Sequence, residues 1–180
     1  ERIADAARQI EGAFSLVITT NDSLVGVRDP QGFRPLCLGK TENGYVLSSE
    51  SCAFDAIKAE FIRHIDPGEM VIIDDSGVRS TIYAEPEKID KKLCVFEYIY
   101  FARGDSHIDG QSVYQSRLNM GRELYNETKY DADIVMSIPD SGTTAALGYA
   151  RASGIPFAEG LVKNRYSGRT FIKPNQEERE

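Results

Sequence analysis

The stretch that decides the fold class of the second half is residues 134–154, with the sequence IVMSIPDSGTTAALGYARASG. Residues 134–138 form a short apolar run of the kind that is buried in a parallel sheet. Pro139 breaks this run, and a helix is predicted over Ala145–Ser153, closed by Gly154. The order of strand, loop and helix predicts an α/β fold for this part of the chain.

Residues 13–83 follow a different pattern, in which short apolar runs are separated by turn signals such as Asn21-Asp22, Asn43-Gly44 and Asp75-Ser76-Gly77. The predicted strands are residues 14–19, 24–27, 36–38, 45–47, 70–73 and 78–83. They predict an antiparallel sheet. One helix is predicted ahead of it, over Ile3–Ile10, and another within it, from about Glu50 to Glu60, where Ser48, Ser49 and Ser51 are available as caps.

The charged stretch from Glu85 to Lys92 separates these two patterns and is predicted to be a linker. A domain boundary is therefore expected near residue 90, giving domains over residues 1–90 and 91–180. The first is an α+β domain and the second an α/β domain, which begins with a helix from Ser112 to about Lys129.

Composition limits the classes of function. The chain has 180 residues, of which 41% are hydrophobic, and its 28 acidic and 21 basic residues give a net charge of -7. This balance argues against general binding to nucleic acid or anionic membranes. No apolar run approaches the roughly 20 residues of a membrane span, and the start of the sequence lacks the apolar core of a secretion signal, so a cytoplasmic location is expected. The three cysteines are widely spaced and suggest neither a disulfide framework nor a local zinc site.

The segment from Lys163 to Thr170, with the sequence KNRYSGRT, crowds three cations, three hydroxyl-bearing side chains and a glycine into eight residues. Such a segment can clamp a polyanion, although a solvated basic turn is the alternative when it is considered alone. The loop from Pro139 to Thr144 lies where open α/β sheets bind ligands, and its hydroxyls can bind phosphate oxygens or a metal; an ordinary helix start is the alternative. Two candidate anion elements in one α/β unit favour a ligand with two phosphate groups.

Other motifs carry less functional weight. The segment from Arg28 to Leu36 joins two strands and is predicted to be structural, with an Arg–Asp pair able to lock it. Arg103-Gly104-Asp105 matches a cell-adhesion tripeptide, but a three-residue match is weak evidence. His64 and His107 are poor candidates for metal or acid–base chemistry, and Cys94 reads locally as a small buried hydrophobic residue.

Taken jointly, the motifs resemble the amidophosphoribosyltransferase family, glutamine-dependent enzymes that open de novo purine biosynthesis. The later part of that family's glutaminase domain is similar to residues 12–17 (GAFSLV), 28–36 (RDPQGFRPL) and 49–53 (SESCA). The early part of its phosphoribosyltransferase domain is similar to residues 94–103, 139–141 and 163–172. The resemblance covers essentially the whole chain. It implies the C-terminal part of an N-terminal-nucleophile glutaminase domain, followed by the N-terminal part of a type I phosphoribosyltransferase α/β domain.

The resemblance also implies a two-site enzyme. An N-terminal cysteine releases ammonia from glutamine, and the ammonia crosses internally to phosphoribosyl pyrophosphate, giving phosphoribosylamine, glutamate and pyrophosphate. Magnesium neutralises the leaving pyrophosphate. Purine nucleotides are expected as feedback inhibitors and a homo-oligomer as the intact enzyme, with no nucleic acid or membrane as a partner.

The family's binding residues are carried over to matching positions. Phosphoribosyl pyrophosphate is expected to bind Asp140, Ser141, Gly142, Thr143, Lys163, Arg165 and Arg169. Ser141 is the expected magnesium contact, and residues 163–170 the expected mobile loop that closes over the substrate. In one branch of the family the cysteine matching Cys94 is a ligand of a 4Fe-4S cluster and in another it is not, so the resemblance leaves the cluster open. Gly104 stands where the family usually has proline.

No catalytic residue is assigned within the chain. Glu1 cannot be the thiol nucleophile, and the paired aspartates that hold the ribose hydroxyls are expected beyond residue 180. The chain is therefore expected to be an internal part of a larger enzyme, inactive by itself. Two alternatives are a non-catalytic regulatory relative that binds phosphoribosyl pyrophosphate, and a structural fragment kept for assembly with other subunits.

Overall fold

The computed structural model describes residues 1–166, 168, 172 and 174–177. Within it the chain forms two compact units, Glu1–Ser116 and Arg117–Glu180. Each unit is described below by itself.

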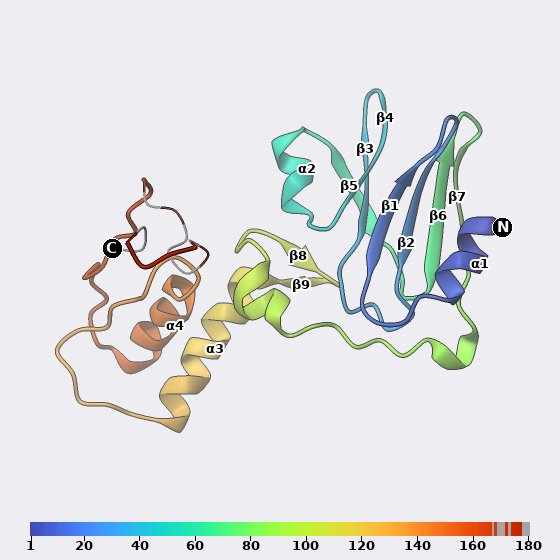
Figure 1. Ribbon diagram of the computed structural model, residues 1–180. Coiled ribbons are helices and arrows are strands. Elements are labelled where there is room, and N and C mark those ends of the chain that lie inside the picture. Colours follow the sequence, from blue (N-terminus) through green and yellow to red (C-terminus); the bar gives the residue numbers. More distant parts are fainter. Residues whose placement is uncertain (167, 169–171, 173, 178–180) are drawn as a thin grey trace. The chain divides into compact units, whose positions relative to one another are not determined.

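The first unit contains a four-stranded antiparallel sheet in the order β1-β2-β6-β7 (Figure 1). Its strands are β1 (Ser15–Thr19), β2 (Leu24–Arg28), β6 (Glu69–Asp74) and β7 (Gly77–Ile82). The helix α1 (Arg2–Arg8) packs on this sheet, since Ala4 and Ala7 share a buried cluster with Val25 and Val27 of β2. These elements confirm the predicted strands and the first predicted helix, because apolar runs bounded by turn residues suit strands with one buried face.

A second antiparallel sheet has the order β4-β3-β5. Its strands are β3 (Cys37–Thr41), β4 (Gly44–Ser48) and β5 (Glu60–His64). The residues of the first half thus form two sheets where the sequence pattern suggested one.

The helix predicted from Glu50 to Glu60 was wrong in its second half. The helix α2 covers only Cys52–Ala56, and Glu60 already begins β5. Lys58 adopts a positive φ of 56°, which an α-helix cannot contain. The aromatic and β-branched residues that follow it pair with β3, so sheet pairing overrides the helical pattern.

The serines expected to cap this helix have other partners. Ser51 is the N-cap residue but makes no side-chain capping hydrogen bond. Its Oγ instead accepts from the backbone N–H of His107 at 2.8 Å, and Ser48 Oγ accepts from the N–H of Glu50 at 3.3 Å.

Residues 85–112 stay within the first unit. They include the short 3-10 helix η1 (Pro86–Lys88), the π-helix η2 (Glu97–Phe101) and a hairpin of β8 (His107–Ile108) and β9 (Gln111–Ser112). Backbone N–H groups of this segment donate to carbonyls of the first half: Asp90 to Pro30, Lys92 to Gln31 and Cys94 to Phe33. The compact unit therefore runs past residue 90, and the domain boundary there stays a prediction.

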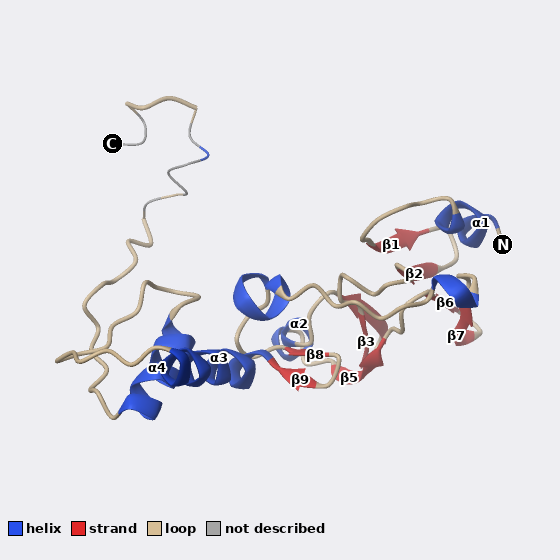
Figure 2. Ribbon diagram, turned by 90° about the horizontal axis from the view of Figure 1, so that it is seen from below, coloured by secondary structure: helices blue, strands red, loops and turns tan. Residues whose placement is uncertain are grey.

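The second unit is organised by two helices that lie side by side in both ribbon views (Figures 1 and 2). These are α3 (Val113–Glu127) and α4 (Thr143–Ser153). A Cβ atom at Gly148 would lie 2.1 Å from the carbonyl oxygen of Leu118, and one at Gly121 would lie 1.8 Å from that of Ala145. The two backbones therefore touch. As predicted, α4 ends at Gly154, which adopts the left-handed conformation with φ 76°.

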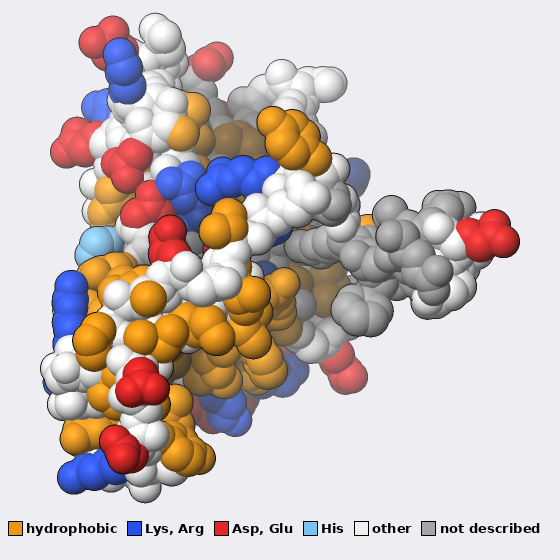
Figure 3. Space-filling model, turned by 90° about the vertical axis from the view of Figure 1, so that its left-hand side faces the viewer, with side chains coloured by type: hydrophobic (Ala, Val, Ile, Leu, Met, Phe, Trp, Pro, Cys, Tyr) orange, Lys and Arg blue, Asp and Glu red, His pale blue; other side chains and the backbone are white. Residues whose placement is uncertain are grey.

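The strand predicted over residues 134–138 is not formed. Only Val135 pairs, in a single parallel bridge with Phe157, and Ile138 is 79% exposed. A parallel strand needs neighbours to receive its hydrogen bonds and cover its faces, and the described residues supply one bridge. Figure 3 shows one face of the molecule, on which hydrophobic side chains gather. No helix in the described part of the chain is long and apolar enough to cross a membrane.

Candidate functional site

The loop from Pro139 to Gly142 leads directly into α4, as the sequence predicted. Gly142 is the N-cap residue, and its carbonyl accepts from the N–H of Ala146 at 3.0 Å. A Cβ at Gly142 would come within 2.8 Å of the carbonyl oxygen of Ile138, so the loop is tight enough to favour glycine there. The peptide bond between Pro139 and Asp140 is cis. The tight turn puts Asp140, Ser141 and Thr143 at the N-terminal end of the helix, where free amides attract anions.

Lys163, at the start of the basic segment, lies beside this loop. Lys163 Nζ is 3.6 Å from Asp140 Oδ2, and both side chains are exposed. Residues of the loop and of the basic segment line one hollow of about 160 Å³, including Ser137, Asp140, Thr143, Lys163 and Arg165. Asp140, Thr143, Lys163 and Arg165, four of the residues predicted from sequence, therefore meet at one site. Arg169 lies outside the described residues.

Two cations, Lys163 and Arg165, and two carboxylates, Asp140 and Glu159, line this hollow, so a phosphorylated ligand suits it best when a metal ion accompanies the ligand. Lys163 supplies a compact positive charge and Arg165 a planar set of donors. Thr143 offers a hydroxyl, which already contacts Ser137 Oγ at 3.1 Å. The carboxylate of Asp140 disfavours a bare anion but can share a cation with one, which matches a ligand that binds together with a metal.

A polar network centred on Arg28 organises the first unit. Arg28 is 1% exposed and pairs with Asp109, its two nitrogens lying 3.2 and 3.1 Å from the two carboxylate oxygens. It also donates to the carbonyls of Gly32, Arg34 and Ile65. The Arg–Asp pair expected within the segment 28–36 was wrong in its partner, since Arg28 pairs with Asp109, which lies outside that segment.

The neighbouring Asp29 has a separate role. It is fully buried, and its carboxylate accepts from the backbone N–H groups of Phe14, Gln31 and Phe33. Asp29 therefore fixes the bend after β2, which confirms the structural interpretation of this segment.

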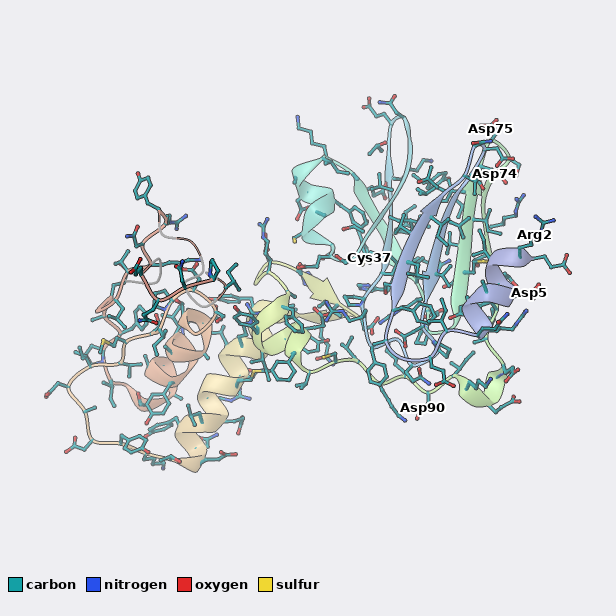
Figure 4. The ribbon with its side chains drawn as sticks, viewed as in Figure 1. Arg2, Asp5, Cys37, Asp74, Asp75 and Asp90 are labelled. Carbon is teal, nitrogen blue, oxygen red and sulfur yellow. The ribbon has the colours of Figure 1, made fainter. Side chains whose placement is uncertain are left out.

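Cys37 and His64 form a contact that sequence reasoning missed. Sγ of Cys37 lies 3.2 Å from Nδ1 of His64, across the pair of strands β3 and β5. Figure 4 labels Cys37 at the start of β3. Burial raises the pKa of the Cys37 thiol to about 12, with Arg28 partly opposing the rise, and burial lowers the pKa of His64. Both groups are therefore neutral near pH 7, so the pair is unsuited to nucleophilic chemistry.

We expect Cys37 to resist alkylation in the folded protein. The raised pKa means that only about one thiol in 10⁴ is ionised at pH 8, and the thiolate is the nucleophile. The rate should rise about ten-fold per pH unit between pH 9 and pH 11. Cys94, which is half-buried, serves as the internal reference. Mass-spectrometric mapping of iodoacetamide adducts checks this, and equal labelling of Cys37 and Cys94 at pH 8 would contradict it.

Comparisons with known proteins address the whole chain. The glutamine phosphoribosylpyrophosphate amidotransferase of Bacillus subtilis, complexed with ADP and GMP, matches with a TM-score of 0.90 and 44% identity over 98% of this chain and 38% of that one. Amidophosphoribosyltransferases of Synechococcus elongatus and Archaeoglobus fulgidus are 54% and 52% identical over 99% and 94% of this chain. Nearly the whole chain is therefore similar to one part of the amidophosphoribosyltransferases. It spans 36% of the length of each of these two relatives, and a family model described as a glutamine amidotransferase domain matches residues 1–56.

The predicted magnesium contact is Ser141, which lies next to Asp140 in the loop before α4. Ser141 and Asp140 offer the hard oxygen atoms that magnesium prefers, so the loop fits a magnesium ion that arrives with a phosphorylated substrate. Cys94 is the residue that the resemblance offers as a ligand of an iron–sulfur cluster. Among the described residues no group of three or more His, Cys, Asp or Glu side chains could hold a metal, so further ligands would have to come from elsewhere.

A contact between residues far apart in the sequence was also not predicted. Oε2 of Glu50 accepts from the backbone N–H of Arg103 at 2.8 Å and from the hydroxyl of Ser106 at 2.7 Å. More than 50 residues separate these partners, so no local pattern reports the contact. The hairpin beyond it did carry a signal, since Asp109-Gly110 is a typical two-residue turn and both residues have positive φ.

Proposed function

We propose that the protein carrying this chain is an amidophosphoribosyltransferase that makes phosphoribosylamine from glutamine and phosphoribosyl pyrophosphate. The observation that carries this proposal is the match of nearly the whole chain, in sequence and structure, to enzymes of that name. The meeting of the 139–143 loop with Lys163 and Arg165 supports it independently, because this hollow has the donors that a pyrophosphate group requires.

In the proposed reaction, the nitrogen of ammonia forms a bond to C1 of the ribose while the bond from C1 to the pyrophosphate oxygen breaks. The pyrophosphate leaves with the electron pair, and the new amine loses a proton. Lys163 and Arg165 would bind the pyrophosphate oxygens, on which negative charge grows as the bond breaks. The amides at the start of α4 and the Thr143 hydroxyl would orient the same group. Bound magnesium would neutralise part of the pyrophosphate charge, with Asp140 and Ser141 as its contacts.

We further propose that Gly142 belongs to the pyrophosphate loop and that residues 163–170, with Arg169, close over the substrate and exclude water. The 180 residues alone are proposed to be inactive, since the family's cysteine nucleophile and paired aspartates are not among them. Cys94 is a proposed cluster ligand.

For the intact enzyme we propose a cytoplasmic homo-oligomer under purine nucleotide feedback. The feedback part is supported by the ADP and GMP bound to the Bacillus subtilis relative.

The proposal is tested with the full-length protein under anaerobic, reducing conditions. Glutamine, magnesium and phosphoribosyl pyrophosphate together should release pyrophosphate and glutamate. Tight binding of phosphoribosyl pyrophosphate without any pyrophosphate release would contradict the proposal and favour the non-catalytic regulatory alternative.

Replacing Lys163 by alanine should raise the KM for phosphoribosyl pyrophosphate about ten-fold to a hundred-fold, since a charge-assisted contact contributes about 1.5–3 kcal/mol. Arg151→Ala is the matched control, because Arg151 is a cation in the last turn of α4, at the end opposite the loop. Steady-state kinetics with varied substrate checks both variants. An unchanged KM in the Lys163 variant would remove Lys163 from the site.

A further inference from the structure

Glu50 joins two parts of the chain that differ in their resemblance to other proteins. It lies within residues 1–56, which match the amidotransferase domain model. Its carboxylate contacts Arg103 and Ser106, which lie beyond that match and just after the π-helix η2.

Several specific hydrogen bonds make up the contact of Glu50 with this turn. One oxygen of the Glu50 carboxylate receives a backbone N–H and a hydroxyl, and the thiol of Cys52 lies 3.7 Å from the same oxygen. Ser106 is 0% exposed, so its hydroxyl has lost water as a partner and depends on protein acceptors. Next to it, Ser51 Oγ accepts from the backbone N–H of His107 at 2.8 Å. Two consecutive residues, Glu50 and Ser51, therefore hold the turn over residues 103–107.

The turn over residues 103–107 connects η2 to the segments that lead into α3. It follows η2, whose conformation is also held by an ion pair of 2.6 Å between Arg34 and the buried Glu97. It precedes the hairpin β8–β9, which continues directly into α3. The backbone closes on itself here, since the N–H of Ser106 donates to the carbonyl of Arg103 and that of Val113 to the carbonyl of Ser106. The contacts of Glu50 therefore fall on the turn that lies between η2 and the hairpin leading into α3.

We propose that Glu50 is a positioning residue that couples glutamine hydrolysis to ribosyl transfer, acting through the turn 103–107. This inference rests on the proposed function, because it needs two reactions to couple. Glu50 touches neither substrate in this role. It sets the turn that leads from the amidotransferase-like part of the chain to the part carrying the pyrophosphate loop, so its loss should separate the two reactions while leaving each one running.

The experiment uses the full-length protein and measures glutamate and pyrophosphate release together, with glutamine and then with ammonium chloride as nitrogen donor. In Glu50→Ala the ratio of glutamate to pyrophosphate released should rise about five-fold or more, the lower end of typical coupling between sites. The ammonia-dependent rate should change less than about two-fold. Glu50→Gln keeps one acceptor oxygen and should restore part of the coupling, and Ser106→Ala should uncouple as Glu50→Ala does.

Asp55→Asn is the matched control, because Asp55 is an exposed carboxylate on the adjacent helix α2. An unchanged release ratio in Glu50→Ala would overturn the inference. An equal fall of the ammonia-dependent and glutamine-dependent rates would also overturn it, because it would show a general loss of folding. Failure of the unaltered protein to release pyrophosphate with either donor would instead overturn the proposed function, so the two failures are distinct.

Discussion

Replacing Arg28 by methionine is expected to lower the free energy of unfolding by about 3–5 kcal/mol, the range for breaking a buried ion pair. The guanidinium group is 1% exposed and serves Asp109 and three backbone carbonyls. Its loss leaves these acceptors buried without their donor. Lys91, 3.4 Å from Asp109, is an exposed cation that pairs with the same carboxylate.

Urea denaturation followed by circular dichroism measures this effect, and Arg79→Met provides the control. Arg79 pairs with Asp74 at the surface, where an ion pair contributes about 0–1 kcal/mol. A double-mutant cycle with Asp109→Asn isolates the pair itself: the double variant should be less destabilised than the sum of the two single variants. A loss of less than 1 kcal/mol in Arg28→Met would contradict the structural role of this network.

Replacing Gly148 by alanine should disrupt the pairing of α3 and α4. The added Cβ would lie 2.1 Å from a backbone carbonyl oxygen of α3, and a helix backbone cannot move aside as a side chain can. Overpacking of this kind costs about 1–3 kcal/mol and occasionally more, and we expect the upper end or beyond because the two helices must separate. The loop before Thr143 would shift with α4, so affinity for phosphoribosyl pyrophosphate should fall as well.

Gly160→Ala is the matched comparison for Gly148→Ala. The Cβ added at Gly160 would meet Met136 Sδ at 2.3 Å, which is the flexible end of a side chain. Methionine adapts readily, so this variant should be clearly less destabilised. Thermal denaturation and isothermal titration of phosphoribosyl pyrophosphate with both variants check the expectation. Equal stability of the two variants would show that the helices are not locked by backbone contact.

Elements whose ends depend on nearby residues were predicted correctly from the sequence. The strands β1, β2, β3, β4, β6 and β7 are bounded by turn residues whose conformations follow from their chemistry, and α4 ends at a glycine that takes the left-handed conformation. The prediction failed where pairing with a distant strand decided the outcome. Residues 60–64 could continue a helix by their own preferences, but β3 recruits them as β5. Residues 134–138 have a strand-like sequence and lack the neighbours that would make them one.

The candidate site shows the same division. The loop over residues 139–143 and the basic residues Lys163 and Arg165 were found from composition and position, because phosphate chemistry has a local signature. The contacts of Glu50 with Ser106 and of Arg28 with Asp109 join residues 56 and 81 positions apart. Tertiary packing decides which residues pair over such distances. These pairs therefore cannot be predicted from a single sequence.

The segment over residues 91–112 has a consequence for how sequence variation in this protein is interpreted. It follows the domain boundary predicted near residue 90, yet its backbone N–H groups donate to the carbonyls of Gln31 and Phe33, and the carboxylate of Asp109 pairs with Arg28. Substitutions on either side of that boundary therefore affect the same contacts. A chimera of two species' proteins, joined near residue 90, would combine residues 28–34 of one protein with residues 91–112 of the other. These two stretches contact each other, so they would no longer be matched. Substitutions in 91–112 should thus be tolerated mainly together with substitutions in 28–34, so the two stretches should change as a set.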